Sequence, residues 1–181
     1  LLRMAKIVHS ADVDEDIDDM RLAFMSHPNT IICEAFRQIR TTLLFSGQVG
    51  QHNSILVTSP MPSDGRTTVT LNLASHLVKG GMKVLVVEAN FRQPAMRHLF
   101  KAACPKIGLS SILLGESTWE ECKFSVNNEF DVISAGPIPK NPAELLGSNE
   151  MAALVEDVAT RYDIVLYDSS PCLIVSDASV L

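Results

Sequence analysis

Basic residues are too few in this sequence for a protein that works on nucleic acid. The 181 residues include 15 lysines and arginines against 21 aspartates and glutamates, which gives a net charge of −6. Proteins that bind DNA or RNA usually carry a basic surface, because the phosphate backbone is negatively charged. We therefore expect no nucleic-acid partner.

Paired cysteines and long apolar runs are also absent. Cys33, Cys104, Cys122 and Cys172 are scattered without a C-x-x-C pair, which argues against a zinc site and against a disulfide framework. No apolar run approaches the roughly 18 residues of a membrane helix, and no basic and then apolar leader opens the chain. These features predict a soluble chain in a reducing cytoplasm.

The rest of the composition predicts one folded domain. Hydrophobic residues make up 46% of the chain, which is enough for one substantial core. We place that domain at residues 31–181. The preceding residues 1–30 include ADVDEDIDDM at 11–20, whose six carboxylates and few apolar groups predict an acidic linker or a solvated edge segment.

Four short apolar runs predict the strands of a central sheet. They span residues 54–59, 83–89, 130–136 and 162–168. Nearly continuous apolar character is typical of strands that are buried on both faces. Helical patterns precede and separate the runs, and the first places Ile32, Phe36, Ile39 and Leu43 on one stripe. The alternation predicts a three-layer α/β fold with a mostly parallel central sheet and helices on both faces.

Capping residues mark two of the helix starts. Ser117 with Glu120 fits a capping box. Asn141, followed by Pro142 and Glu144, fits a cap with a first-turn proline. Both starts lie between the second and fourth predicted strands.

The stretch SPMPSDGRTT, residues 59–68, stands between the first strand and the next helix. Gly65 permits a close backbone approach, and the amides around Thr67 at the start of the helix favour an anion. The hydroxyl of Thr67 suits Mg²⁺, but Arg66 stands where phosphate-binding loops usually have lysine. A plain turn before a helix is the alternative, since Ser, Asp and Thr favour such ends.

Polar residues follow two further strands. Glu88 and Asn90 come at the end of the second strand, and Asp168 ends the fourth. Ligands of parallel sheets bind beyond the carboxyl ends of the strands. A threonine and a carboxylate that converge there suit a magnesium-phosphate group, so we expect Thr67 and Asp168 to hold the metal. Alternatively, Asp168 only caps the next turn.

Longer stretches extend these motifs. They are EAFRQIRTTLLF (34–45), TSPMPSDGRTTVTLNLA (58–74), VLVVEANFRQPAMRHLF (84–100), GLSSILLGEST (108–118), SAGPIPKNPAELLGS (134–148) and YDIVLYDSSP (162–171). Together they resemble the cytoplasmic kinase domain of bacterial tyrosine kinases that regulate capsular and exopolysaccharide export, relatives of the MinD and ParA ATPases. The first, second, third and last match the family's ExxRxxR helix, Walker A loop, second Walker motif and Walker B strand.

The resemblance implies a P-loop NTPase fold that binds ATP or ADP with Mg²⁺. The implied cofactor-binding residues are Ser63, Asp64, Gly65, Arg66, Thr67, Thr68 and Arg92, the implied metal ligands are Thr67 and Asp168, and the implied catalytic residues are Arg66, Glu88 and Asp168. On this pattern Arg66 neutralises phosphate charge, and Glu88 orients or deprotonates the attacking hydroxyl. Arg92 steadies the loop after the second strand.

The ExxRxxR helix implies an oligomer. The family uses this helix to form rings, and the matching residues are Glu34, Arg37 and Arg40. Without the resemblance, the same spacing is typical of an ordinary solvated helix face with weak ion pairs.

Three positions depart from the family's pattern. Arg66 replaces the loop lysine, Glu88 replaces the first aspartate of the second Walker motif, and Asn90 replaces the second. Arginine keeps the charge of lysine but not its point-charge geometry. Losing one preorganised contact typically costs about 3 kcal/mol of transition-state stabilisation. Because backbone amides and the helix dipole do not depend on the lysine, we expect nucleotide binding to survive better than phosphoryl transfer.

Three functional hypotheses follow. The first is a tyrosine autokinase domain at the inner face of the bacterial inner membrane, which forms a homo-oligomer and works with a membrane-embedded polysaccharide co-polymerase or activator segment, in the same chain or a separate protein. The second is a pseudokinase that serves as a nucleotide switch or scaffold in polysaccharide export, which the three departures favour. The third is a MinD- or ParA-like ATPase, against which the ExxRxxR helix and the segment GPIPKNPAELL argue.

The tyrosines bear on the first hypothesis. Tyr162 and Tyr167 are the only two, and they flank or lie in a predicted buried strand, so they are poor phosphate acceptors. We expect the chain to be a piece of a longer protein. An acceptor tail rich in tyrosine either follows Leu181 or does not exist.

Overall fold

The computed structural model describes residues 31–45, 53–173 and 177. The acidic segment predicted over residues 1–30 lies outside them. Within the described part of the chain, no helix combines the length and the apolar character that crossing a bilayer requires.

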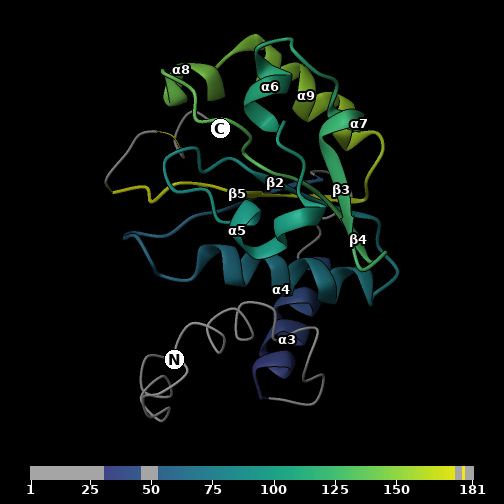
Figure 1. Ribbon diagram of the computed structural model, residues 1–181. Helices are drawn as coiled ribbons and strands as arrows, with labels where there is room; N and C mark the ends of the chain where they lie inside the picture. The colour runs from purple at the N-terminus through teal and green to yellow at the C-terminus, as the bar shows by residue number, and fades with distance from the viewer. Residues whose placement is uncertain (1–30, 46–52, 174–176, 178–181) are drawn as a thin grey trace.

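A five-stranded sheet forms the middle layer (Figure 1). Its strands are β1 (Ser54–Val57), β2 (Val84–Glu88), β3 (Lys123–Val126), β4 (Phe130–Ile133) and β5 (Ile164–Asp168). The order is β1-β5-β2-β4-β3, and every neighbouring pair is parallel except β3 and β4. The mostly parallel sheet confirms the predicted fold class.

The antiparallel strand β3 was not predicted. Its four residues KFSV are only partly apolar and lie at the edge of the sheet, so they lack the continuous apolar signal of the buried strands. Residues 127–129 connect β3 to β4, and Asn127 and Asn128 have φ values of 51° and 56°. Positive φ at two central residues is typical of a tight hairpin turn, and asparagine tolerates it well.

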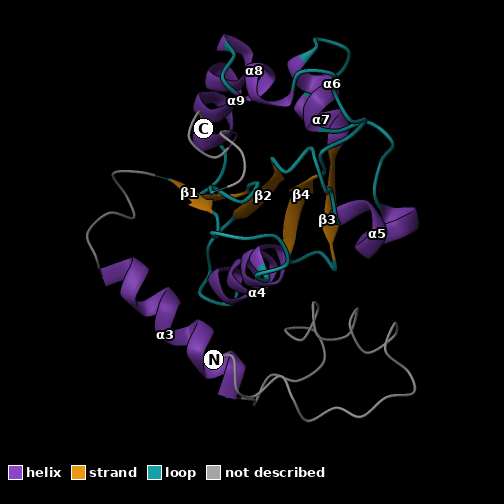
Figure 2. Cartoon of the chain, turned by 90° about the vertical axis from the view of Figure 1, so that its left-hand side faces the viewer, coloured by secondary structure: helices purple, strands orange, loops and turns teal. Residues whose placement is uncertain are grey.

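Helices cover both faces of the sheet, as Figure 2 shows. The first face carries α4 (Arg66–Val78) and α5 (Met96–Phe100), and α3 (Ile31–Phe45) packs against α4. The second face carries α6 (Leu109–Leu113), α7 (Trp119–Cys122), α8 (Pro142–Leu146) and α9 (Asn149–Ala159). A short 3-10 helix, η1 (Lys101–Ala103), follows α5. This is the three-layer arrangement that the alternation of strands and helices predicted.

Two buried clusters pack on the two faces of the sheet. In β2, Leu85 and Val87 belong to the cluster under α6 to α9, whereas Val84 and Val86 belong to the cluster under α3 to α5. Successive residues of a strand point to opposite faces. Glu88 therefore shares the face of Val84 and Val86, next to α4 and α5, and the same alternation places Asp168 of β5 there.

Helix α3 packs against α4 through part of its predicted stripe. The ring of Phe36 stacks on His76 of α4 with centroids 5.6 Å apart, and Leu43 packs at the edge of the same cluster. Ile32 and Ile39 are exposed to 52% and 42%. The four residues lie on one helix as predicted, and Phe36 and Leu43 are the two that pack against the cluster.

One predicted cap is displaced by a residue. The capping box of α7 is formed by Thr118 and Glu121, not by Ser117 and Glu120. Thr118 has the extended backbone of a cap residue, and its N–H donates to Glu121 Oε2 at 2.9 Å. The prediction of Asn141 before a first-turn Pro142 in α8 is confirmed.

Candidate functional site

The loop between β1 and α4 lies at the carboxyl edge of the sheet. Gly65 ends it with φ 89° and ψ 19°, and an added Cβ would meet nothing within 4 Å. The left-handed backbone, rather than lack of space, is therefore what favours glycine here. Ser63 also has a positive φ of 63°, and Asp64 accepts a hydrogen bond from the N–H of Met61 at 2.9 Å. These features curl the loop back over the start of α4.

The start of α4 suits an anion. The first four N–H groups of a helix have no acceptor within it, and no side chain of the described residues caps this helix. Ser63 and Asp64 are exposed, while Thr67 and Thr68 are partly buried. The helix dipole adds positive potential at this end. The arrangement matches the predicted phosphate site, although the role of each residue stays a prediction.

Thr67 and Asp168 meet at this edge. The hydroxyl of Thr67 donates to Asp168 Oδ2 at 2.6 Å, which joins α4 to the end of β5. Asp168 is 1% exposed, and its second oxygen, Oδ1, has no hydrogen-bond partner among the described residues. A buried polar atom without a partner is costly, so this oxygen is suited to a ligand.

The surroundings of Asp168 favour its protonated form when no cation is near. Burial raises the pKa of its carboxyl from 3.8 to about 7, and the neighbouring charge of Glu88 adds to the rise. The hydrogen bond from Thr67 and the positive charge of Arg66 act in the opposite direction. A divalent cation bound to Oδ1 would supply the missing positive charge and favour the ionised carboxylate.

The donor set fits Mg²⁺. A hydroxyl and a carboxylate, both oxygen ligands, stand beside a helix N-terminus that suits phosphate. No group of three or more His, Cys, Asp or Glu residues that could hold a metal occurs in the described ranges. Magnesium usually keeps several waters and binds through one or two protein oxygens together with phosphates, so two ligands suffice.

The guanidinium of Arg66 is held within the protein. Its Nε donates to the backbone oxygen of Ser169 at 2.9 Å, and Nη1 donates to Ser59 Oγ at 2.6 Å and to the backbone oxygen of Met61 at 2.9 Å. The residue is 8% exposed. Arg66 therefore joins the loop to the residue after β5, and our prediction that it neutralises a bound phosphate stays untested.

Both carboxylate oxygens of Glu88 accept backbone hydrogen bonds. Oε1 accepts from the N–H groups of Ala95 and Met96 at 2.5 and 2.8 Å, and Oε2 accepts from Ala135 at 2.9 Å. Burial raises the pKa of Glu88, and these three hydrogen bonds oppose the rise. The side chain thus fixes the start of α5 to the ends of β2 and β4. The predicted catalytic role of Glu88 stays a prediction.

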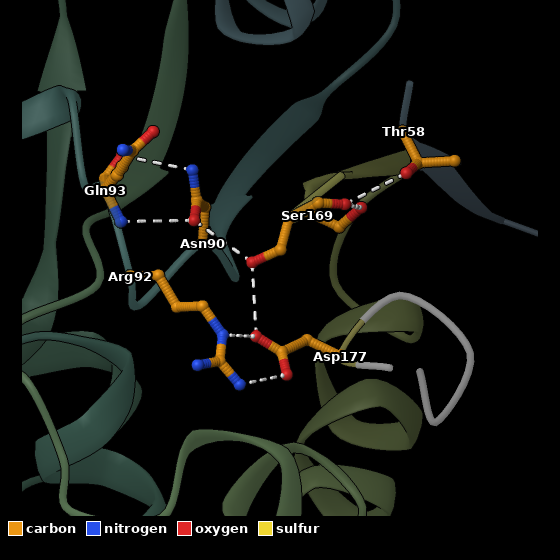
Figure 3. Close-up of polar contacts among 7 residues, drawn as sticks. Thr58, Asn90, Arg92, Gln93, Ser169 and Asp177 are labelled. Carbon is orange, nitrogen blue, oxygen red and sulfur yellow. Dashed lines mark hydrogen bonds and ion pairs between the residues drawn. The ribbon is translucent and has the colours of Figure 1, made fainter. Parts of the chain in front are cut away.

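Arg92 pairs with a residue that sequence reasoning missed. Its Nε and Nη2 bind the two oxygens of Asp177 at 2.8 and 3.0 Å, as Figure 3 shows. Asn90 forms a local turn with Gln93 and accepts from Ser170 Oγ at 3.0 Å. Arg92 was predicted to bind the cofactor, and its described contacts are with protein. No sequence motif points to Asp177 as the partner of Arg92, because the two residues are 85 positions apart.

The residues predicted to form an oligomer contact lie on α3, away from the carboxyl edge of the sheet. Glu34 and Arg37 pair with each other at 2.5 Å, and their side chains are 55% and 46% exposed. Arg40 instead donates to the backbone oxygen of His76 at 3.0 Å and so ties α3 to α4 of its own chain.

The raised pKa of Asp168 makes stability depend on pH. The folded chain holds this proton more tightly than the unfolded chain, so the contribution of Asp168 is full below its ordinary pKa of 3.8 and is lost as the pH rises through about 7. Without metal or nucleotide, the unfolding free energy should fall by about 2 kcal/mol more in the wild type than in Asp168→Asn between about pH 5 and pH 8. Urea denaturation at both pH values measures this, and parallel curves for the two proteins would contradict it.

Residues 63–181 match a protein family described as AAA domain. Tyrosine-protein kinase YwqD of Bacillus subtilis is 37% identical over 158 residues, which cover 87% of this chain and 66% of that protein. Putative tyrosine-protein kinase CapB of Staphylococcus aureus is 30% identical over 84% of this chain and 67% of its own length. Putative tyrosine-protein kinase AmsA of Erwinia amylovora is 36% identical, and the chain spans only 22% of it.

Solved structures with a similar fold indicate the same family. The chimerical protein CapA2B2 has a TM-score of 0.82 and 35% identity over 88% of this chain and 70% of that one. The septum site-determining protein MinD of Pyrococcus horikoshii, solved with Mg-ADP, has a TM-score of 0.55 and 21% identity over 65% of this chain and 48% of that one, so it shows the fold alone. The chain therefore belongs to the bacterial tyrosine-protein kinase family, which has the P-loop fold of the AAA domain.

Proposed function

We propose that this chain binds Mg²⁺ with ADP or ATP at the carboxyl edge of the sheet, as the kinase-type domain of a regulator of capsular or exopolysaccharide biosynthesis and export. The contact between Thr67 and Asp168 carries the proposal. It places a hydroxyl and a buried carboxylate together at 2.6 Å, beside the uncapped start of α4, and leaves Asp168 Oδ1 without a partner. This is what a magnesium-phosphate group needs from the protein.

Each part of the site has a separate task in this proposal. The free amides at the start of α4 bind phosphate oxygens, with the helix dipole behind them. Thr67 and Asp168 hold Mg²⁺, directly or through its waters, and the metal when bound neutralises phosphate charge. Arg66 keeps the loop folded over this edge through its hydrogen bonds to Ser59, Met61 and Ser169.

The place of the domain in a larger system is also part of the proposal. A membrane-embedded activator or co-polymerase segment, in the same chain or another, would bring the domain to the inner face of the inner membrane, where it forms a homo-oligomer. Helix α3 supports an assembly role, because Ile31 and Ile32 are exposed to 77% and 52% beside the exposed pair of Glu34 and Arg37. Large exposed apolar residues on one helix are typical of an interaction surface.

Magnesium and nucleotide should stabilise the protein together. At about a hundred times its dissociation constant, Mg-ADP adds about 2.7 kcal/mol, which raises the melting temperature of a chain of this size by roughly 5–10 °C. Asp168→Asn and Thr67→Ala should each remove most of the magnesium-dependent part of this shift. Differential scanning fluorimetry with ADP, with and without Mg²⁺, measures both effects.

Thr67→Ser is the matched control, because it keeps the hydroxyl that contacts Asp168. It should retain the magnesium-dependent shift. A wild-type protein that shows no shift at millimolar Mg-ADP would refute the proposed function.

A pseudokinase is the second candidate, and two side chains favour it. Arg66 and Glu88 stand where the family has lysine and aspartate, and both are engaged by protein groups, through three hydrogen bonds each. Tyr162 and Tyr167 are each 4% exposed, so neither is accessible as an acceptor. On this account the domain binds nucleotide as a switch and transfers phosphate poorly.

Restoring the family's residues tests the second candidate. In the full-length protein, Arg66→Lys combined with Glu88→Asp should raise tyrosine phosphorylation by about a hundredfold or more, since one preorganised contact is worth that much in rate. Phosphotyrosine is measured by immunoblot or mass spectrometry after incubation with Mg-ATP. Adding Asp168→Asn to the restored protein should abolish the signal. Strong phosphorylation by the unmodified protein would exclude the pseudokinase.

A further inference from the structure

A second polar network lies next to the proposed metal site and joins the loop after β2 to the chain after β5. It consists of Asn90, Arg92, Ser170 and Asp177, which we call the rim latch (Figure 3). The hydroxyl of Ser170 lies 3.0 Å from Asn90 Oδ1 and 3.2 Å from Asp177 Oδ2. The single hydroxyl proton of Ser170 is thus shared between Asn90 Oδ1 and Asp177 Oδ2.

The contacts of Asn90 require an amide. Its Nδ2 donates to the backbone oxygen of Gln93 at 3.0 Å, while its Oδ1 accepts from the N–H of Gln93 at 3.2 Å and from Ser170. Asparagine supplies a donor and an acceptor on one side chain, whereas an ionised aspartate only accepts. An aspartate at this position would set a carboxylate oxygen against the carbonyl of Gln93.

The rim latch contains one positive charge, on Arg92, and one negative charge, on Asp177. Asp177 is fully buried, and Arg92 binds both of its oxygens in the bidentate geometry that guanidinium and carboxylate favour. An aspartate at position 90 would put a second carboxylate on the hydroxyl of Ser170, with one guanidinium for two negative charges. Unpaired buried charge is strongly unfavourable. The identity of residue 90 is therefore matched to Asp177.

The rim latch acts on the segment that begins with Asp168. The backbone oxygen of Ser170 accepts from Thr58 Oγ1 at 3.0 Å, and that of Ser169 accepts from Arg66 Nε at 2.9 Å. Residues 168–170 are thus held on one side by the phosphate loop and on the other by the rim latch. Asp168 itself ends β5 between Val57 and Glu88 of the neighbouring strands, and these contacts hold the two residues that follow it.

We propose that Arg92 and Asp177 are positioning residues that act through Ser170 on Asp168, and that Asn90 is the partner that keeps their charges balanced. The magnesium part of this inference rests on the proposed function, whereas the charge matching does not. Arg92 takes part as the partner of Asp177 rather than as a phosphate ligand. Replacing Asn90 by aspartate would therefore destabilise the folded chain.

A double-mutant cycle without nucleotide tests the charge matching. Asn90→Asp should lower the melting temperature by roughly 5–10 °C in the wild type, because it loses the bond to Gln93 and adds an unpaired charge. In the Asp177→Asn background the second effect is absent, so the drop should be less than half as large. Equal drops in the two backgrounds would overturn the rim latch. If Asp177→Asn does not fold, Asn90→Ala provides the comparison: it also loses the bond to Gln93 but adds no charge, so its drop should be less than half that of Asn90→Asp.

Magnesium titration tests the positioning role. In Arg92→Lys and Asp177→Asn, the Mg²⁺ concentration that gives half of the ADP-dependent stabilisation should rise about tenfold, as is typical when a residue behind a metal ligand is changed. Metal-free ADP should bind with unchanged affinity, which a general loss of structure would not allow. The matched control is Lys123→Met, which removes a partly buried ion pair with Asp131 at the other side of the sheet and should leave the magnesium dependence unchanged.

Different results would overturn the positioning role and the proposed function. A wild type that binds Mg-ADP, with Arg92 and Asp177 variants of unchanged magnesium dependence, would overturn the positioning role and leave the proposed function standing. A wild type that binds no Mg-ADP would overturn the proposed function and the positioning role, while the nucleotide-free cycle still decides the charge matching.

Discussion

The hydrogen bond between Thr67 and Asp168 is the interaction on which the rest of the site depends. It connects the first turn of α4 with the end of β5, which lies between β1 and β2 in the sheet. The cost of burying the carboxylate shows in its pKa, which is raised to about 7. Such a cost is tolerated where a ligand relieves it, and strongly shifted groups at strand ends are typical of functional sites.

The neighbouring carboxylate, that of Glu88, is also buried, but backbone groups donate hydrogen bonds to it. Glu88 lies beside Asp168 in the register of β2 and β5, and it is equally buried. Three backbone N–H groups donate to its two oxygens and fix the side chain to the scaffold. Of the two adjacent carboxylates, only Asp168 keeps a free oxygen. This difference is why our proposal assigns the metal to Asp168.

The sequence predicted the layers and that Thr67 and Asp168 converge at the strand ends, because apolar runs mark buried strands and ligand-binding residues follow strand ends. It did not predict the hydrogen-bond partners of Arg66 and Glu88. Those partners are mostly backbone groups, which every residue carries and no motif marks. Asp177 was missed for a related reason, since only the fold brings it to Arg92. Strand β3 was missed because an edge strand needs no continuous apolar run.

The location of the bound metal tests the central claim most directly. Mn²⁺ replaces Mg²⁺ at oxygen sites and broadens the NMR signals of nearby amides. With ADP present, our account predicts that Mn²⁺ broadens the amide signals of Gly65, Thr67 and Asp168 first, at sub-stoichiometric concentration, and that Asp168→Asn removes this effect. Broadening that starts at other acidic residues, with the signals of Thr67 and Asp168 unchanged, would contradict it.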